Sequence, residues 1–348
     1  MIAEYKFDNY RHIIEYSYFN EKGQPCYYDK DYHILRVKYD LRGNVTQRSI
    51  YGVDGKPTLS REGSSIIEYK YDSKNNIIRT DFKDITGKNV NQESSGYSTE
   101  TLSYNERNLL ESRTYFDKNG APCQKKDFKN DMYLNYSRIE YRFDSKGNIV
   151  EYIFYDEHNN LCKANGYAIE YVAYDDLNRI IEQKYKKYNG ILGSGGNHHM
   201  GILRYKYDNK SNYVSEIEFY DQDSLLQARM FQNVNKGVIT RKEIKDKENR
   251  LKSMLLYGFT DTKYAIMIDS IDERGLNLKR TYYGEDGKPG NIEEGFATLV
   301  NTYDRFGRVE SQELFDNHGK PVHGTIGKYH RRTIKYNKFG LIEEECFF

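Results

Sequence analysis

Several residues that commonly stabilise or anchor a protein are scarce here. Tryptophan is absent, and the 348 residues include only five prolines and four cysteines. Four cysteines are too few for a disulfide framework in a chain of this length. No apolar run approaches membrane length, and the start, MIAEYKFDNY, lacks the features of a secretion signal. The sequence predicts no membrane span, and either a cytoplasmic location or export by a non-standard route.

The chain also has almost no net charge, because its 53 Lys and Arg residues are balanced by 52 Asp and Glu residues. Nucleic-acid binding normally needs a net basic face that replaces counterions, so a nucleic-acid partner is not expected. Tyrosine is abundant instead, with 35 residues, while apolar residues make up only 37%. This composition favours thin β layers covered by tyrosine rings over a deep aliphatic core.

A short marker recurs about every 32 residues, which is the signature of a repeat architecture. It is an aromatic residue, then Asp or Asn, and usually Gly or Asn three residues later. The copies are Tyr39-Asp40 with Gly43, Tyr71-Asp72 with Asn75, Tyr104-Asn105 with Asn108, Phe143-Asp144 with Gly147, Tyr174-Asp175 with Asn178, Tyr207-Asp208 with Ser211, Tyr303-Asp304 with Gly307, and Tyr336-Asn337 with Gly340. Phe7-Asp8 opens the series in weaker form.

Two further markers share this period. All five prolines occupy one repeat position, at the end of a Gly-x-Pro step that comes after an aromatic residue: Pro25, Pro57, Pro122, Pro289 and Pro321. A third aromatic precedes the first marker by seven residues, at Tyr32, Tyr97, Tyr136, Tyr167, Phe296 and Tyr329. The sequence therefore predicts one array of about ten units over residues 1–348, with irregular insertions near 125–135 and 190–201.

The residues between the markers alternate in polarity. In the segment 67–71, Ile67, Tyr69 and Tyr71 share one face, and Glu68 and Lys70 share the other. This period of two indicates half-buried antiparallel strands. Asp caps the turn, Gly or Asn tolerates its positive φ, and proline ends the following strand. We expect an all-β fold of tandem antiparallel hairpins that form an elongated, curved or spiralling sheet.

Residues 228–270 form a degenerate unit, in which the first marker is reduced to Lys245-Asp246 and Ile271-Asp272. Five apolar residues of this stretch could instead share one face of a helix: Ile244, Leu251, Met254, Leu255 and Phe259. A hairpin is favoured because Asp246, Asn249 and Tyr257 fall on the repeat template.

The markers resemble the YD repeats of Rhs-type bacterial proteins. Tyr-Lys-Tyr-Asp-x-x-x-Asn at 69–76 and Tyr-Arg-Phe-Asp-x-x-Gly-Asn at 141–148 carry the resemblance. It implies long spiralling β-sheets, some of which close into shells around a toxin domain. The unit here is longer by the Gly-x-Pro corner, and no self-cleavage segment or toxin-like domain is seen after Tyr336. The resemblance supports the sheet and does not imply a toxin.

Candidate ligands for metals are few. Cys26, Cys123 and Cys162 share one repeat position with Thr58, Val90 and Val322, which indicates a small buried slot. Zinc would need closely paired cysteines, and a disulfide between neighbouring units is the minor alternative. His198 and His199 follow a glycine-rich stretch that begins at Gly193, and they are weak metal candidates in what is expected to be a flexible insertion.

The recurring acids could line a calcium ladder, but turn capping explains them without an ion: Asp40, Asp72, Asp144, Asp156, Asp175, Asp208, Asp221 and Asp304. No catalytic constellation and no cofactor site stands out. We expect a non-catalytic scaffold that presents tyrosine and charged residues to a protein partner, including a place in an Rhs-like assembly. The alternative is a carbohydrate- or cell-surface-binding module, and an enzyme within 190–265 is a third class.

Overall fold

The computed structural model describes residues 1–126, 135–164, 166–193, 200–208, 212–257, 263–325 and 327–348. The prediction of an all-β fold of antiparallel hairpins is confirmed, because the described residues form 22 β-strands and the short 3₁₀ helix η2 (Met254–Tyr257). No helix among these residues is long and apolar enough to cross a membrane.

The chain divides into two compact units, which are described separately. Unit 1 comprises Met1–Tyr171 and Lys187–Gly190, and unit 2 comprises Val172–Lys186 and Ile191–Phe348. Unit 1 contains β1 (Ile2–Phe7), β2 (Ile13–Phe19), β3 (Ile34–Tyr39), β4 (Val45–Tyr51), β5 (Ile66–Tyr71), β6 (Ile77–Lys83), β7 (Thr99–Tyr104), β8 (Leu110–Phe116), β9 (Arg138–Phe143) and β10 (Ile149–Tyr155). The strand β11 (Ile169–Tyr174) has residues in both units.

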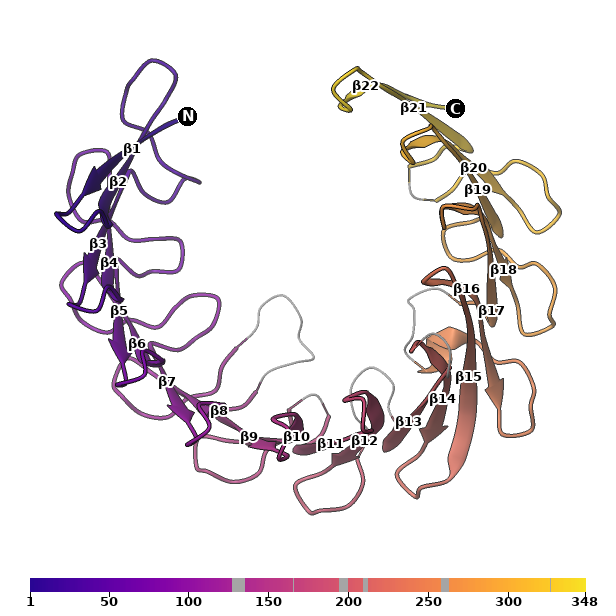
Figure 1. Ribbon diagram of the computed structural model, residues 1–348, viewed down its shortest axis with the longest axis horizontal. Coiled ribbons are helices and arrows are strands. Elements are labelled where there is room, and N and C mark those ends of the chain that lie inside the picture. The colour runs from indigo at the N-terminus through magenta and orange to yellow at the C-terminus, as the bar shows by residue number, and fades with distance from the viewer. Residues whose placement is uncertain (127–134, 165, 194–199, 209–211, 258–262, 326) are drawn as a thin grey trace. The chain divides into compact units, whose positions relative to one another are not determined.

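Unit 2 contains β12 (Ile180–Lys186), β13 (Ile202–Tyr207), β14 (Val214–Tyr220), β15 (Leu226–Asn235), β16 (Val238–Asp246), β17 (Ile266–Ile271), β18 (Asn277–Tyr283), β19 (Thr298–Tyr303), β20 (Val309–Phe315), β21 (Arg331–Tyr336) and β22 (Ile342–Phe347). Within each unit, the hairpins follow one another in chain order along a curved sheet (Figure 1).

The pairing pattern is repeated from hairpin to hairpin. In the hairpin β3–β4, Ile34 lies opposite Tyr51, and the register shifts by one residue between Lys38 and Tyr39. Neighbouring hairpins join through a shorter antiparallel ladder, in which Glu15 of β2 lies opposite Arg36 of β3. Each hairpin thus adds two strands, and its markers recur at equivalent places in the sheet.

Asp40 shows how the first marker forms the hairpin turn. Its N–H donates to the Asn44 carbonyl at 2.9 Å, and the Gly43 N–H donates to the Asp40 carbonyl at 3.0 Å. The Asp40 carboxylate also accepts from the backbone N–H groups of Arg42 and Asn44, both at 2.9 Å. Gly43 has a φ of 83°, and this left-handed conformation explains the preference for Gly or Asn.

The Gly-x-Pro corner has the same local structure, which the sequence analysis did not recognise. The Asp117 carboxylate accepts from the N–H groups of Asn119 and Ala121, both at 2.9 Å, as Asp40 does. Pro122 then forms a bridge with Phe116, and the Cys123 N–H donates to the Tyr115 carbonyl at 3.0 Å. The Tyr-Asp marker and the Gly-x-Pro corner therefore form the same kind of turn. After the corner, the chain runs back beside the strand that precedes it.

Rings of the third marker form part of the core of unit 1. They alternate with rings from the second strand of each hairpin. The centroid distances are 4.6 Å for Tyr97–Tyr115, 5.9 Å for Tyr115–Tyr136, 5.1 Å for Tyr136–Phe154 and 5.8 Å for Phe154–Tyr167. Tyr115 is fully buried. Unit 2 repeats the arrangement at Tyr264, Tyr282 and Phe296, with centroid distances of 5.0 and 6.1 Å. Burial of these large rings stabilises each thin layer.

The degenerate unit contains the favoured hairpin over residues 226–246, whereas Met254–Tyr257, within the stretch for which a helix was the alternative, forms the short 3₁₀ helix η2. Strands β15 and β16 are ten and nine residues long, and Lys236 and Gly237 between them have φ values of 48° and 80°. Two positive φ values are the requirement of a two-residue type I′ turn. Lys245-Asp246, expected at the hairpin turn, is instead the corner after β16, because Lys245 bridges to Leu251.

Candidate functional site

The marker tyrosines connect consecutive hairpins. In six of them, the hydroxyl donates to the carbonyl of the residue that opens the second strand of the preceding hairpin. The bonds are Tyr39 to Ile13 at 2.9 Å, Tyr71 to Val45 at 2.8 Å, Tyr104 to Ile77 at 3.2 Å, Tyr207 to Ile180 at 2.7 Å, Tyr303 to Asn277 at 2.8 Å and Tyr336 to Val309 at 3.1 Å. These marker tyrosines therefore link their hairpins to the preceding hairpins in the sheet.

A repeated cluster of Arg, Tyr and Glu lies on one side of the sheet in unit 1. Arg36 Nε donates to Glu15 at 2.7 Å, and the Arg36 guanidinium lies 4.3 Å from the centre of the Tyr51 ring. We call the side of the sheet that carries Glu15, Arg36 and Tyr51, and the equivalent side of the other hairpins, the charged face.

The cluster recurs on the charged face of later hairpins. In unit 1, Arg138 pairs with Glu140 at 2.7 Å and lies 4.1 Å from the Tyr155 ring centre. The Tyr155 hydroxyl donates to Glu140 at 3.0 Å. In unit 2, Arg204 Nε donates to Glu182 at 2.8 Å, and its guanidinium lies 4.8 Å from the ring centre of Tyr220.

These clusters combine ordered charge with access to solvent. The Arg36 side chain is 48% exposed and that of Glu15 is 11% exposed. Burial disfavours the ionised Glu15, but hydrogen bonds from Lys6 and Arg36 outweigh it and hold the pKa of this carboxyl below its usual range. The same balance lowers the pKa of Glu182, where Lys184 and Arg204 donate. The charged face thus presents guanidinium groups and tyrosine rings in fixed positions.

The candidate metal ligands form no metal site in the part of the chain that the structure describes. Among the described residues, no group of three or more His, Cys, Asp or Glu side chains could hold a metal ion. His198 and His199 lie outside the described residues.

The cysteine slot is half-buried, which corrects the expectation of a small buried slot. All four cysteines are free and partly exposed: Cys26, Cys123, Cys162 and Cys346. Burial nevertheless raises the pKa of the Cys123 thiol to about 11 and that of Cys162 to about 12.

A wide hollow in unit 1 surrounds a histidine that the sequence analysis did not single out. His12 Nδ1 lies 3.0 Å from Asp8 Oδ2, and the His12 ring stacks on Tyr39 at 4.7 Å. Arg179 makes the equivalent contacts, because it pairs with Asp175 at 2.7 Å and lies over the Tyr207 ring at 4.3 Å. His12 therefore occupies a repeat position that completes the turn and packs on the next hairpin.

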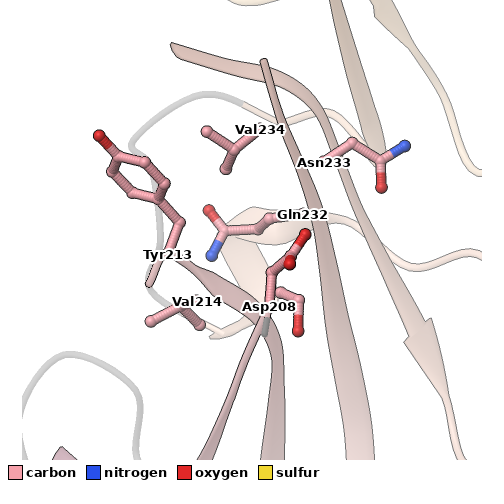
Figure 2. Close-up of a pocket in the computed structure, with 7 residues that line it drawn as sticks. Asp208, Tyr213, Val214, Gln232, Asn233 and Val234 are labelled. Atoms are coloured by element: carbon pink, nitrogen blue, oxygen red, sulfur yellow. The ribbon is translucent and has the colours of Figure 1, made fainter. Parts of the chain in front are cut away.

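A second hollow, in unit 2, breaks the repeat. It has a volume of about 270 Å³ and lies between the start of β14 and the far part of β15 (Figure 2). Its described lining consists of Asp208, Tyr213, Val214, Ser215, Gln232, Asn233 and Val234. The repeat markers do not predict this hollow, although Lys236-Gly237 between two alternating segments is a signal for the long hairpin that forms it.

Comparisons with known proteins give only remote likenesses. No family model and no curated protein matches this sequence. Similar solved structures include TcdB2-TccC3-TEV (12% identity, 99% of this chain and 15% of that chain, TM-score 0.30) and TcdB2-TccC3 without its hypervariable C-terminal region (12%, 98%, 18%, 0.34). A third is a Photorhabdus luminescens Tc holotoxin pore (12%, 99%, 23%, 0.18). This chain spans less than a quarter of each of those chains.

Proposed function

We propose that this chain is a non-catalytic β-repeat scaffold whose charged face binds a protein partner. The recurrence of the Arg–Tyr–Glu cluster is the observation that supports the proposal. Arg36 and Arg204 each combine a carboxylate of the preceding hairpin with a tyrosine ring, and Arg138 combines a carboxylate of its own strand with a tyrosine ring. Arginine and tyrosine are among the residues that most often dominate protein–protein binding energy, because they join a large contact area to directional polar groups.

The clusters also suit binding on entropic grounds. A side chain that is already held by a carboxylate and a ring loses less freedom when a partner arrives. The partner should carry acidic or amide groups that reach the exposed guanidinium edges, and salt should weaken the complex. The resemblance of the markers to YD repeats extends the proposal to an Rhs-like assembly, in which the partner is another component of that assembly.

The test is capture of partners by the immobilised chain from an extract of its source cells, followed by mass spectrometry. Three proteins are compared: the unchanged chain, the double variant Arg36→Ala/Arg138→Ala, and the control Arg48→Ala. Arg48 is exposed in the same unit, and the strand register places it on the opposite side of the sheet.

A specific partner should bind the unchanged chain and the Arg48→Ala control equally. The double variant should bind it at least about tenfold more weakly, because each arginine is an anchor of the interface. Equal capture of every protein by all three chains would contradict the proposal.

A further inference from the structure

The hairpin β15–β16 is longer than its neighbours, and among the described residues no strand pairs with the far part of β15 on its β14 side. The ladder between β14 and β15 ends at the pair Glu216 and Phe231. Strand β15 continues to Asn235, where it pairs with Val238 of β16. The hollow of about 270 Å³ lies along this extension, beside Gln232, Asn233 and Val234.

Both ends of the hollow are bounded. At one end, β14 pairs with β15 at Glu216 and Phe231. At the other end, the Tyr213 hydroxyl lies 3.1 Å from the position that a Cβ on Gly237 would take. An added strand would have to run past Tyr213 to continue along β15. The hollow therefore suits a compact ligand, and its volume is slightly below the range of sites for drug-sized molecules.

The side chains of β15 alternate across the hollow. Figure 2 shows Gln232 and Val234 projecting toward the side of Tyr213 and Val214, and Asn233 projecting to the opposite side. A strand has this alternation because successive side chains point to opposite faces.

The ligand side of the hollow combines three kinds of surface. Tyr213 is 46% exposed and offers a ring face, Val214 and Val234 offer methyl groups, and the Gln232 amide can both donate and accept hydrogen bonds. Among the described residues of the lining, Asp208 is the only charged one. A carboxylate accepts hydrogen bonds and repels anions, so phosphates and acidic sugars are disfavoured.

We propose that this hollow binds one neutral sugar ring of a glycan. A pyranose has an apolar C–H side that can lie against Tyr213 and the valine methyl groups, and an edge of hydroxyl groups that can pair with Gln232 and Asp208. Tyrosine offers an aromatic ring and a polar group together, which suits a ligand with the same two characters. The inference does not depend on the charged face, which lies on other residues.

The test is saturation-transfer NMR with the full chain and four probes: D-glucose, D-galactose, D-mannose and N-acetyl-D-glucosamine. At least one should receive saturation at its ring protons. Gln232→Ala and Tyr213→Ala should each weaken binding by about tenfold or more, because each removes a contact in the hollow. Asn235→Ala is the matched control and should leave binding unchanged, since Asn235 is exposed on the same strand, is not part of the lining, and lies on the side away from Gln232 by strand alternation.

Thermal midpoints of the three variants show whether each is folded, and Tyr213→Phe provides a second variant that keeps the ring. Tyr213→Phe should bind more tightly than Tyr213→Ala if the ring makes the contact. Absence of transfer to all four sugars would overturn the proposal, as would binding that survives both Gln232→Ala and Tyr213→Ala in folded protein. Binding of an extended hexapeptide that no sugar displaces would show strand addition at β15 and would also overturn it.

Discussion

The hydroxyl of Tyr71 donates a hydrogen bond of 2.8 Å to the carbonyl oxygen of Val45, 26 residues earlier. Tyr71 ends the first strand of one hairpin, and Val45 opens the second strand of the hairpin before it. The carbonyl lies where the ladder of the earlier hairpin shifts register. The phenol group therefore satisfies a backbone acceptor that the irregular ladder leaves available, and it ties two hairpins together.

Tyr71→Phe should lower the free energy of unfolding by about 1 kcal/mol, because the ring stays in place and only this hydrogen bond is lost. Urea unfolding followed by circular dichroism measures the change. Tyr10→Phe is the control, since Tyr10 is 80% exposed, and it should change the stability by less than about 0.5 kcal/mol. Equal losses for the two variants would show that the Tyr71 bond does not stabilise the fold.

Phe143→Tyr should produce the converse effect. Phe143 occupies the marker position of its hairpin but has no hydroxyl group, and Leu110 opens the second strand of the preceding hairpin. The new hydroxyl should reach the Leu110 carbonyl and stabilise the chain by about 0.5–1.5 kcal/mol. The same urea titration measures it. A destabilised variant would mean that the marker position of this hairpin differs from that of Tyr71.

The turn aspartates should make the fold sensitive to acid. Side-chain hydrogen bonds from Asn44, Asn76 and Asn148 are the largest cause that lowers the pKa of Asp40, Asp72 and Asp144, respectively. The unfolded chain therefore binds more protons than the folded chain below about pH 4, and stability should fall as the pH drops through that range. Thermal midpoints between pH 7 and pH 2 measure the effect. A constant midpoint over the whole range would contradict it.

Asp72→Asn provides the matched variant for this acid effect. Asn105 and Asn337 already occupy the same turn position in other hairpins, so the variant should fold at pH 7. Its amide oxygen can still accept the backbone bonds but does not titrate. The acid-induced decrease of the thermal midpoint should be smaller in the variant than in the unchanged chain.

Gly147→Val should destabilise the chain by about 1–2 kcal/mol, because Gly147 has a φ of 96° and valine is strained in that region. Gly147→Asn should cost less, since Asn75, Asn108 and Asn178 hold the equivalent conformation with φ values of 61–67°. Lys70→Ala, on an exposed strand residue, should have the smallest effect. Equal unfolding midpoints for the three variants would contradict the assigned turn.

Cys123 and Cys162 should react slowly with a thiol reagent at pH 8 in the folded chain. Burial raises the pKa of these thiols to about 11 and about 12, so only a small fraction is present as the reactive thiolate. Labelling followed by peptide mass spectrometry gives the rate at each cysteine. Denaturant should bring both rates up to that of an exposed thiol. Fast labelling of both in the folded chain would contradict their burial.

Much of the local structure was predictable because it depends on a few neighbouring residues. Asp40 and Gly43 define a turn through bonds within five residues, and the alternation from Ile67 to Tyr71 defines a strand. The equivalence of the Tyr-Asp turn and the Gly-x-Pro corner was hidden by the proline, although Asp117 binds the backbone as Asp40 does. A hairpin was favoured for the degenerate unit, but its turn at Lys236-Gly237 was not located because this turn lacks the marker.

The all-β class, the repeat period and the positions of most turns follow from the sequence alone, because left-handed glycines and capping aspartates act on their own backbone. Which tyrosines are buried and which side chains come into contact depend instead on the packing of neighbouring hairpins. Tyr115 is buried between Tyr97 and Tyr136, and Arg36 meets Glu15 across two strands. Such contacts join residues of different hairpins, and their energies depend on how neighbouring hairpins pack and exclude water.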